Sequence, residues 1–381
     1  MIGGAQTFAR LARQLEAERR EAAAIVSAIV ADIERHLDTP LNPAWRTFGM
    51  VQLLCDAARE ELVRSPKRSL HVAQLAAAIA DALPDTYPAV LHAQGAAEAW
   101  KSVSNAHRFQ SRYEAALQAL DIADRRVAGI VVLAYDRAVL ALARAITLRE
   151  IGRTTEALLL LDGAREVFND HRDLKQLAQC DLATGLIQQR AGNFAAARQA
   201  FMRVIPSARD AGDLHTMAAA YNNLGRAAAE HGDIHAAVDA LAQARAIFRE
   251  LDMPTEIARV TWTIGMAQLA AGRYEPAIAI LRDARAELLR LAMPEEAGLA
   301  GVDLIEALLA MNARAEAREL AAIVAGEFRT AGLNERALQA VAYLQESADV
   351  ASPATAHRVG VYLRRLKEEP ALIFIAPDPE Q

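Results

Sequence analysis

The chain of 381 residues is poor in the residues that mark several common classes of protein. Aromatic residues make up 5% of it, and its two cysteines are Cys55 and Cys180. They lie too far apart to form a CxxC unit. We therefore expect a reducing compartment without structural disulfides.

Long apolar runs and a basic surplus are missing as well. Charged residues interrupt every stretch that approaches the length of a membrane-spanning helix. The first residues lead into the charged stretch from Arg10 to Glu21, without the basic and apolar regions of a secretory signal. The formal net charge of −6 is unlike that of a general nucleic-acid binder. We expect a cytoplasmic protein whose partners include neither a membrane nor nucleic acid.

Recurrent catalytic patterns are also missing from the sequence. It contains no GxxxxGK[ST] phosphate loop, no GxSxG elbow and no HExxH zinc helix. The nearest pair of histidines, His231 and His235, falls at a turn and is better explained as solvent-facing than as a metal site. Cys180 is more easily explained as a small core residue than as a nucleophile. The sequence thus predicts no enzyme, no metal and no cofactor.

What the chain does have is a large share of small and aliphatic apolar residues. Apolar residues account for 53% of the sequence, mostly Ala, Leu, Ile and Val. Alanine is the best helix former and is small enough for helices to approach closely. This composition predicts an all-α protein with tight helix-on-helix packing.

A turn-plus-helix pattern recurs with a step of 40 residues. The recurring block starts at Gly152, Gly192, Gly232, Gly272 and, in a degenerate copy, Asn312. A column of mostly small residues precedes it (Ala145, Gly185, Gly225, Gly265, Ile305), and a second periodic turn lies between blocks, including Met253-Pro254 and Met293-Pro294. Each unit therefore reads as helix, turn, helix, turn.

Physical chemistry explains the residue types in these columns. Gly or Asn supplies the left-handed conformation that ends the first helix of a unit. A small residue in mid-helix lets the paired helix cross nearby, and Pro254 and Pro294 suit the first turn of a helix. A single unit cannot bury its apolar stripe alone, so the units must stack.

These columns resemble tetratricopeptide repeats. The most similar copy is Ala220 to Gly225 followed by Gly232-Asp233, and the next is Val260 to Gly265 followed by Gly272 to Tyr274. The units are longer than usual and resemble the long-helix variant of bacterial peptide-sensing regulators and kinesin light chain. The resemblance implies a right-handed α-α superhelical solenoid that binds another protein or an extended peptide.

The same logic divides the chain into regions. We predict an N-terminal capping helix over 1–40, diverged helix pairs over 41–127, five repeats over 128–331, capping helices over 332–367 and an extended apolar and acidic tail over 368–381. The N-terminal helix could alternatively form a homodimer. The apolar tail from Pro370 to Pro377 either covers the last helix, serves as a partner segment or is disordered.

A partner would bind where the first helices of the units line the concave side. Counting from the mid-helix Gly places Gln189, Asn222, Trp262 and Met266 on that face, with Arg226 beside them. Arg190 and Arg259 extend a positive edge that would favour an acidic residue or terminus. Family resemblance adds Asn223, because an asparagine just before the mid-helix Gly often bonds a peptide backbone. Trp262 would be the main anchor, although a shift of one residue would put it in the core.

Two functions fit this surface. The first is a non-catalytic scaffold or adaptor that binds a protein or peptide in the concave groove. The alternative is a peptide-responsive sensor whose superhelix changes shape when the ligand binds, because small rotations between units add along a stack.

Overall fold

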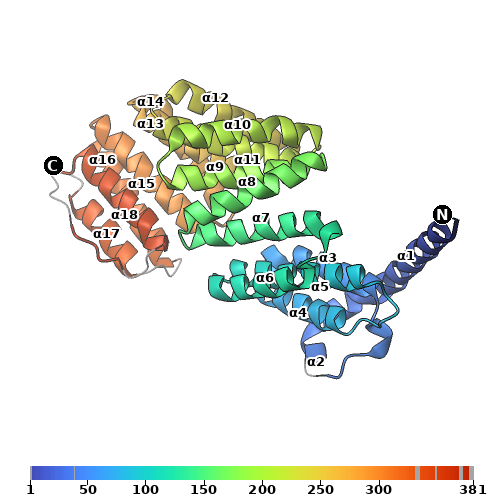
Figure 1. The fold of residues 1–381 in the computed structure, drawn as a ribbon. Coiled ribbons are helices and arrows are strands. Elements are labelled where there is room, and N and C mark those ends of the chain that lie inside the picture. The colour runs from blue at the N-terminus through green and yellow to red at the C-terminus, as the bar shows by residue number, and fades with distance from the viewer. Residues whose placement is uncertain (1, 38, 331–334, 348–349, 369–371, 377–381) are drawn as a thin grey trace. The chain divides into compact units, whose positions relative to one another are not determined.

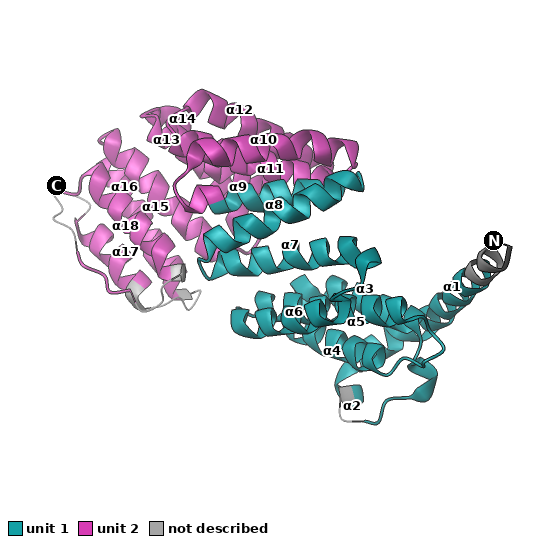
Figure 2. Cartoon of the chain, in the orientation of Figure 1, with its two compact units in different colours: residues 1–187 teal, residues 188–381 magenta. Residues whose placement is uncertain are grey.

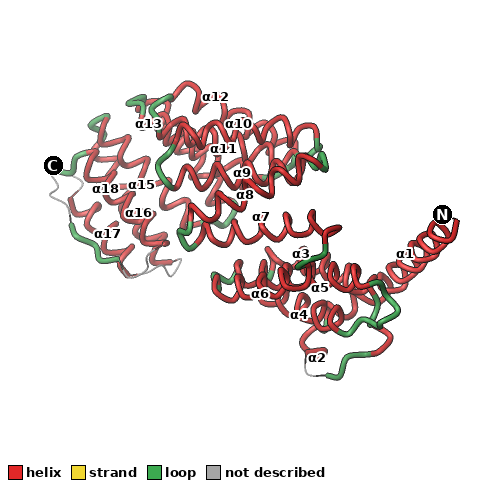
Figure 3. The backbone as a smooth tube through the Cα atoms, viewed as in Figure 1, coloured by secondary structure: helices red, strands yellow, loops and turns green. Residues whose placement is uncertain are grey.

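The computed structural model describes residues 2–37, 39–330, 335–347, 350–368 and 372–376. Within these residues every regular element is helical, and short turns join successive helices (Figures 1 and 3). The predicted all-α stack of helix pairs is confirmed. The chain divides into two compact units, residues 1–187 and 188–381 (Figure 2). The division falls within helix α9 (Leu174–Arg190), a boundary that the repeat pattern did not indicate.

Unit 1 begins with helices that pack on the first helix pairs. Its elements are α1 (Ile2–Ala31), α2 (Ile33–Leu37), η1 (Pro43–Trp45), α3 (Phe48–Arg64), α4 (Pro66–Asp81), α5 (Ala89–Phe109), α6 (Tyr113–Val127), η2 (Val131–Leu133), α7 (Ala134–Glu150) and α8 (Thr154–Asp170). The N-terminal capping helix predicted over 1–40 is divided into α1 and α2, because the helix is interrupted at Asp32. Ala22, Val26 and Ile33 are buried in the same core as Leu54 of α3.

Unit 2 continues the pairs with helices of 13 to 17 residues. They are α10 (Phe194–Asp210), α11 (Leu214–Glu230), α12 (Ile234–Glu250), α13 (Pro254–Ala270), α14 (Tyr274–Arg290), α15 (Pro294–Ala310), α16 (Arg314–Thr330), α17 (Glu335–Ser347) and α18 (Pro353–Glu368). Pro254 and Pro294 stand at the helix starts, as predicted. The first helices of successive pairs, α11, α13 and α15, contact one another and form the face that carries the site described below.

The turns confirm the conformation assigned to the repeating glycines. Gly192 and Gly232 have φ of 78° and 84°, and Asn312 keeps the same left-handed region at 57°. The second turn is periodic too, with Asp252 and Ala292 at φ of 51° and 56°. These two residues precede the Met-Pro pairs, so the left-handed residue lies one position before the pairs that mark this turn in the sequence.

Mid-helix glycines hold the two helices of a pair close together. A Cβ atom on Gly225 of α11 would lie 2.6 Å from Cγ of Leu241 in α12. At Gly265 of α13 the corresponding distance to Leu281 of α14 is 2.7 Å. Real Cβ atoms do not approach this closely, so any larger residue would push the pair apart. This confirms the role predicted for the small-residue column.

The last two helices depart from the regular pattern. Helix α17 packs against α16, as the first helix of a further unit would, whereas α18 packs against α15. Residues 372–376 then cross these helices: the Phe374 ring lies 5.7 Å from that of Tyr343 and 4.9 Å from that of Tyr362. Tyr362 Oη donates to the Leu372 carbonyl at 3.1 Å. Of the three alternatives for the tail, these contacts favour a cover over the last helices for residues 372–376, whereas Pro370, Ala371 and Pro377 lie outside the described residues.

Candidate functional site: an apolar hollow ringed by arginines

The first helices of unit 2 enclose a hollow of about 660 Å³. Helices α11 and α13 supply most of its wall, α15 supplies one residue and α18 another. Its lining comprises Asn222, Arg226, Ala229, Glu230, Arg259, Trp262, Thr263, Met266, Ala267, Ala270, Glu296 and Arg364. Five of the eight residues predicted for the groove therefore meet at one place: Asn222, Arg226, Arg259, Trp262 and Met266.

Trp262 sits between the core and the hollow. It packs against the apolar cluster that includes Leu299 and Val302 of α15, while the residue stays partly exposed. The indole Nε1 donates to Oδ2 of Asp303 at 2.8 Å. The hydrogen bond fixes the ring orientation, and Trp262 acts as both a core residue and a lining residue. The two placements considered from the sequence are thus both partly realised.

Asp303 is a buried carboxylate beneath the hollow. It is 2% exposed and accepts from Arg364 Nη1 of α18 at 2.9 Å and 3.2 Å, in addition to the indole of Trp262. A buried charge is tolerated only where it is paired and hydrogen-bonded. Asp303 meets that condition with donors from two other helices, and both of those donors belong to residues that line the hollow.

Arg259 is already neutralised by acidic neighbours. Its Nε and Nη2 donate to the Glu296 carboxylate at 2.9 Å and 2.7 Å, and Glu256 lies 3.6 Å from its Nη1. The hydrogen bonds to Glu296 raise the pKa of Arg259 above its usual value. This bidentate pair uses the planar fork of the guanidinium. Arg259 therefore contributes less free positive charge to the groove than the sequence indicated.

Arg226 and Asn222 are the lining groups with unused hydrogen-bonding capacity. Across the described part of the chain, Arg226 has neither an ion pair nor a hydrogen-bond partner, and its side chain is exposed. Oδ1 of Asn222 is buried and has no hydrogen-bond partner among the described residues. A buried polar atom without a hydrogen-bond partner is uncommon and lowers the stability of the fold, so its presence needs an explanation.

Three predicted groove residues do not line the hollow. Asn223 donates through Nδ2 to the Ala219 carbonyl of its own helix at 2.9 Å, which commits its amide to that helix. Gln189 donates to Oε2 of Glu230 at 3.3 Å and so touches the rim through that residue. Arg190 is exposed at the end of α9, away from the lining.

Sequence reasoning missed Glu296, Asp303 and Arg364. No local motif marks them, because each meets its partner from a different helix. The one available signal was the register of α15: Glu296 and Asp303 lie 37 and 41 residues after their partners Arg259 and Trp262, which is close to one repeat. Arg364 had no such signal, since its position depends on α18 packing against α15.

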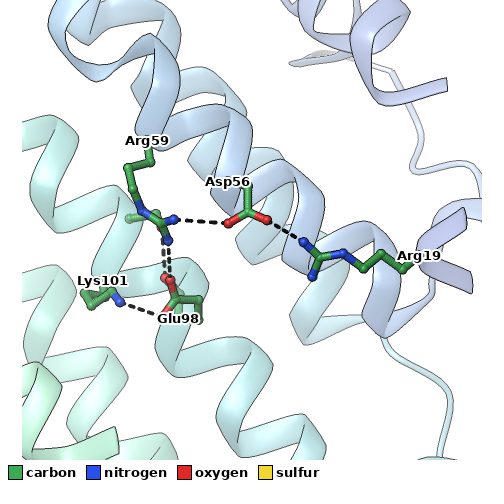
Figure 4. A network of polar contacts seen from close by, with 6 residues as sticks. Arg19, Asp56, Arg59, Glu98 and Lys101 are labelled. Carbon is green, nitrogen blue, oxygen red and sulfur yellow. Dashed lines mark hydrogen bonds and ion pairs between the residues drawn. The ribbon is translucent and has the colours of Figure 1, made fainter. Parts of the chain in front are cut away.

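The corresponding helices of unit 1 carry charged side chains in place of an apolar floor. Arg19, Asp56, Arg59, Glu98 and Lys101 form a continuous chain of ion pairs over α1, α3 and α5 (Figure 4). A hollow of about 320 Å³ beside them is lined by Arg59, Glu98 and Lys101 together with Tyr135 and Asp136. Since these charges already pair with one another, this hollow offers a poorer site for an apolar group.

The two cysteines, the potential metal ligands and the helix lengths bear on other kinds of chemistry. Burial raises the pKa of both thiols, Cys55 and Cys180, to about 12. Among the described residues, no group of three or more His, Cys, Asp and Glu side chains is arranged to hold a metal ion. None of the described helices combines the length and apolar character needed to cross a membrane.

Two comparisons of the sequence with known proteins bear on the family of the chain. The family model for the tetratricopeptide repeat matches residues 184–250 and 216–286. No curated protein matches the chain in sequence.

Several solved structures share the fold at low sequence identity. The apo form of RapI is 12% identical, with 94% of this chain and 100% of that chain covered and a TM-score of 0.63. A Rap protein complexed with Competence and Sporulation Factor is 14% identical, with 94% and 99% covered and a TM-score of 0.53. Aspartyl phosphate phosphatase F from Bacillus subtilis is 12% identical, with 95% and 94% covered and a TM-score of 0.54.

Proposed function

We propose that this chain of tetratricopeptide repeats, which the family model matches over residues 184–286, is a non-catalytic scaffold. It binds a peptide or an extended segment of another protein. The binding site is the hollow of unit 2. The ligand lies along α11 and α13 and places an apolar side chain on Trp262 and Met266.

One observation carries this proposal: an apolar floor and unused polar groups meet in the same hollow. Trp262, Met266 and Ala270 supply apolar surface, while Asn222 and Arg226 supply an acceptor and a donor. Ligand sites combine mostly apolar walls with a few placed polar groups. An extended peptide fits such a surface, because it offers both side chains and a backbone that needs hydrogen bonds.

The fold neighbours are compatible with this proposal and do not identify the ligand. One of them, a Rap protein, was solved in complex with Competence and Sporulation Factor, so a chain of this fold holds a second molecule. Another is named an aspartyl phosphate phosphatase. At 12% to 14% identity the likeness is one of fold, and the residues of the hollow alone carry the argument here.

A peptide-responsive sensor is the second candidate. The observation that favours it is the contact of Asp303 with both Trp262 and Arg364, which joins the floor of the hollow to the C-terminal helix. A ligand that moves the indole would thereby act on α18. Small-angle scattering separates the two functions: a sensor compacts markedly when ligand is added, whereas a scaffold keeps its radius of gyration.

Selection from a random peptide library on phage, with the full chain as bait, tests the proposal. Peptides that bind the wild-type chain are then measured against Trp262→Ala and Met266→Ala. We expect losses of about thirtyfold for Trp262→Ala, as for a central anchor. Met202→Ala is the matched control, because Met202 is exposed on α10 outside the hollow. Unchanged affinity for folded Trp262→Ala, shown by circular dichroism, would place the site elsewhere, and an empty selection would contradict peptide binding.

A further inference from the structure

We propose that the C-terminal helix completes the hollow and that the site takes a peptide carrying an anionic group, which Arg226 of α11 and Arg364 of α18 bind together. This inference rests on the proposed function and deepens it. It adds the chemical class of the ligand and gives binding roles to Arg364 and Asp303, which no sequence motif indicated.

The charges around the hollow are the first step. Three arginines and two glutamates line it, but they differ in what they have left to offer. Arg259 and Glu296 satisfy each other in a bidentate pair, and Glu230 accepts from Gln189. Arg226 has no partner among the described residues. The unpaired positive charge available to a ligand is therefore that of Arg226. Arg364 is balanced by Asp303 and adds unused N–H donors.

Arg364 has unused N–H donors although it is paired with Asp303. Both of its hydrogen bonds to Asp303 come from Nη1, and within the described residues neither Nη2 nor Nε has an acceptor. A guanidinium carries five N–H groups in a fixed fork, which suits carboxylate and phosphate oxygens. The side chain lines the hollow and can bond an anion while its Nη1 remains on Asp303.

Asp303 acts here as a positioning residue. Its carboxylate is buried and holds the Arg364 guanidinium and the Trp262 indole at 2.9 Å and 2.8 Å. The apolar floor and the anion-binding group thus have a common support. An anionic ligand that rests an apolar side chain on Trp262 meets Arg364 in an orientation fixed before it binds, which lowers the ordering cost of binding.

The third contact is the unpartnered Oδ1 of Asn222. An amide oxygen accepts hydrogen bonds only, so the ligand must bring a donor there, either an N–H or an O–H. A peptide backbone supplies one next to each side chain. The hollow can therefore bind three groups of one ligand: an anion at Arg226 and Arg364, an N–H at Asn222 and an apolar side chain at Trp262. An extended acidic peptide carries all three.

The test uses the full chain and pools of short peptides blocked at both ends. Each pool combines Leu, Phe or Trp with one central residue, which is Glu, Gln or phosphoserine. Binding is followed by the fluorescence anisotropy of a label on the peptide. Comparing the Glu and phosphoserine pools distinguishes the two sources of the anion, and the Gln pool is the uncharged reference.

We expect the wild type to bind an anionic pool about ten- to a hundredfold more tightly than the Gln pool. Arg226→Gln and Arg364→Gln should each remove most of that preference between the anionic and Gln pools, whereas Trp262→Ala weakens all pools alike. Arg209→Gln, on the outer part of α10, is the matched control. Arg226 has no described partner to lose, so its variant stays folded even if Arg364→Gln is unstable.

The outcomes separate the two proposals. If peptides bind through Trp262 but the Glu and Gln pools bind equally, the anion site is wrong and the peptide site stands. The same holds if Arg226→Gln keeps the full preference. If no pool binds and the library selection is also empty, both proposals fall.

Discussion

The indole Nε1 of Trp262 donates to the buried carboxylate of Asp303 across the interface of α13 and α15. The two residues are 41 positions apart, about one repeat, so this hydrogen bond joins one repeat to the next. Asp303 also accepts from Arg364, which ties α18 into the same contact. Two residues that line the hollow are thus held by one buried carboxylate.

Removing this carboxylate should cost stability. Asp303→Leu leaves the Trp262 indole and the Arg364 guanidinium without their acceptor, and we expect a loss of about 1–3 kcal/mol in the free energy of unfolding. Asp303→Asn keeps an acceptor oxygen and should cost less. Urea unfolding followed by circular dichroism measures both. Asp283→Asn on the exposed face of α14 is the control, and a loss of equal size there would show that the hydrogen bonds of Asp303 are not the cause.

Mid-helix glycines should respond to alanine in opposite ways according to their surroundings. Gly225→Ala would place a Cβ 2.6 Å from Leu241, and we expect a loss of about 1–3 kcal/mol from overpacking. Gly163 lies in mid-helix in α8 with no atom within 4 Å of the added Cβ. Gly163→Ala should therefore gain about 0.5–1 kcal/mol through helix propensity. Thermal unfolding of the two variants checks the sign, and a gain at Gly225 would contradict the close packing of α11 and α12.

This contrast also shows which parts of the structure can be predicted from the sequence. The step of 40 residues placed the glycines, the turns and the register of the first helices, because each depends on contacts within one unit. Trp262, Met266 and Arg226 could be assigned to one face from that register. The neutralisation of Arg259 and the position of Arg364 could not, because they depend on which helix packs against α15. Nor could the sequence show that Asn223 Nδ2 donates to a carbonyl of its own helix.

The two thiols should be inert in the folded chain. Burial raises the pKa of Cys55 and of Cys180 to about 12, and the thiolate is the reactive form. At pH 8 only about one thiol in ten thousand is then ionised. We expect almost no reaction with Ellman's reagent at pH 8 and the release of both thiols when urea unfolds the chain. Cys55→Ser and Cys180→Ser assign the two signals, and rapid labelling of the native chain would contradict the burial of the thiol concerned.

The contact of α18 with α15 should make part of the stability depend on pH through Glu306. Its Oε2 lies 3.1 Å from Nδ1 of His357 of α18, and the carboxyl group faces Arg364 from α18 and Asp303 from its own helix. Burial raises the pKa of Glu306 above its ordinary value of 4.5, against the opposing effects of His357 and Arg364.

Because the folded chain then holds this proton more tightly than the unfolded chain, the stabilising contribution is complete below the ordinary pKa. It is lost as the pH rises through the raised pKa. Glu306→Gln cannot lose a proton, so the free energy of unfolding of this variant should fall less than that of the wild type as the pH rises above about 4.5. Urea unfolding at a series of pH values measures the difference. Glu319→Gln, on the exposed face of α16, should follow the wild type at every pH. If Glu306→Gln also follows it throughout, the carboxylate keeps an ordinary pKa and the packing of α18 on α15 does not perturb it.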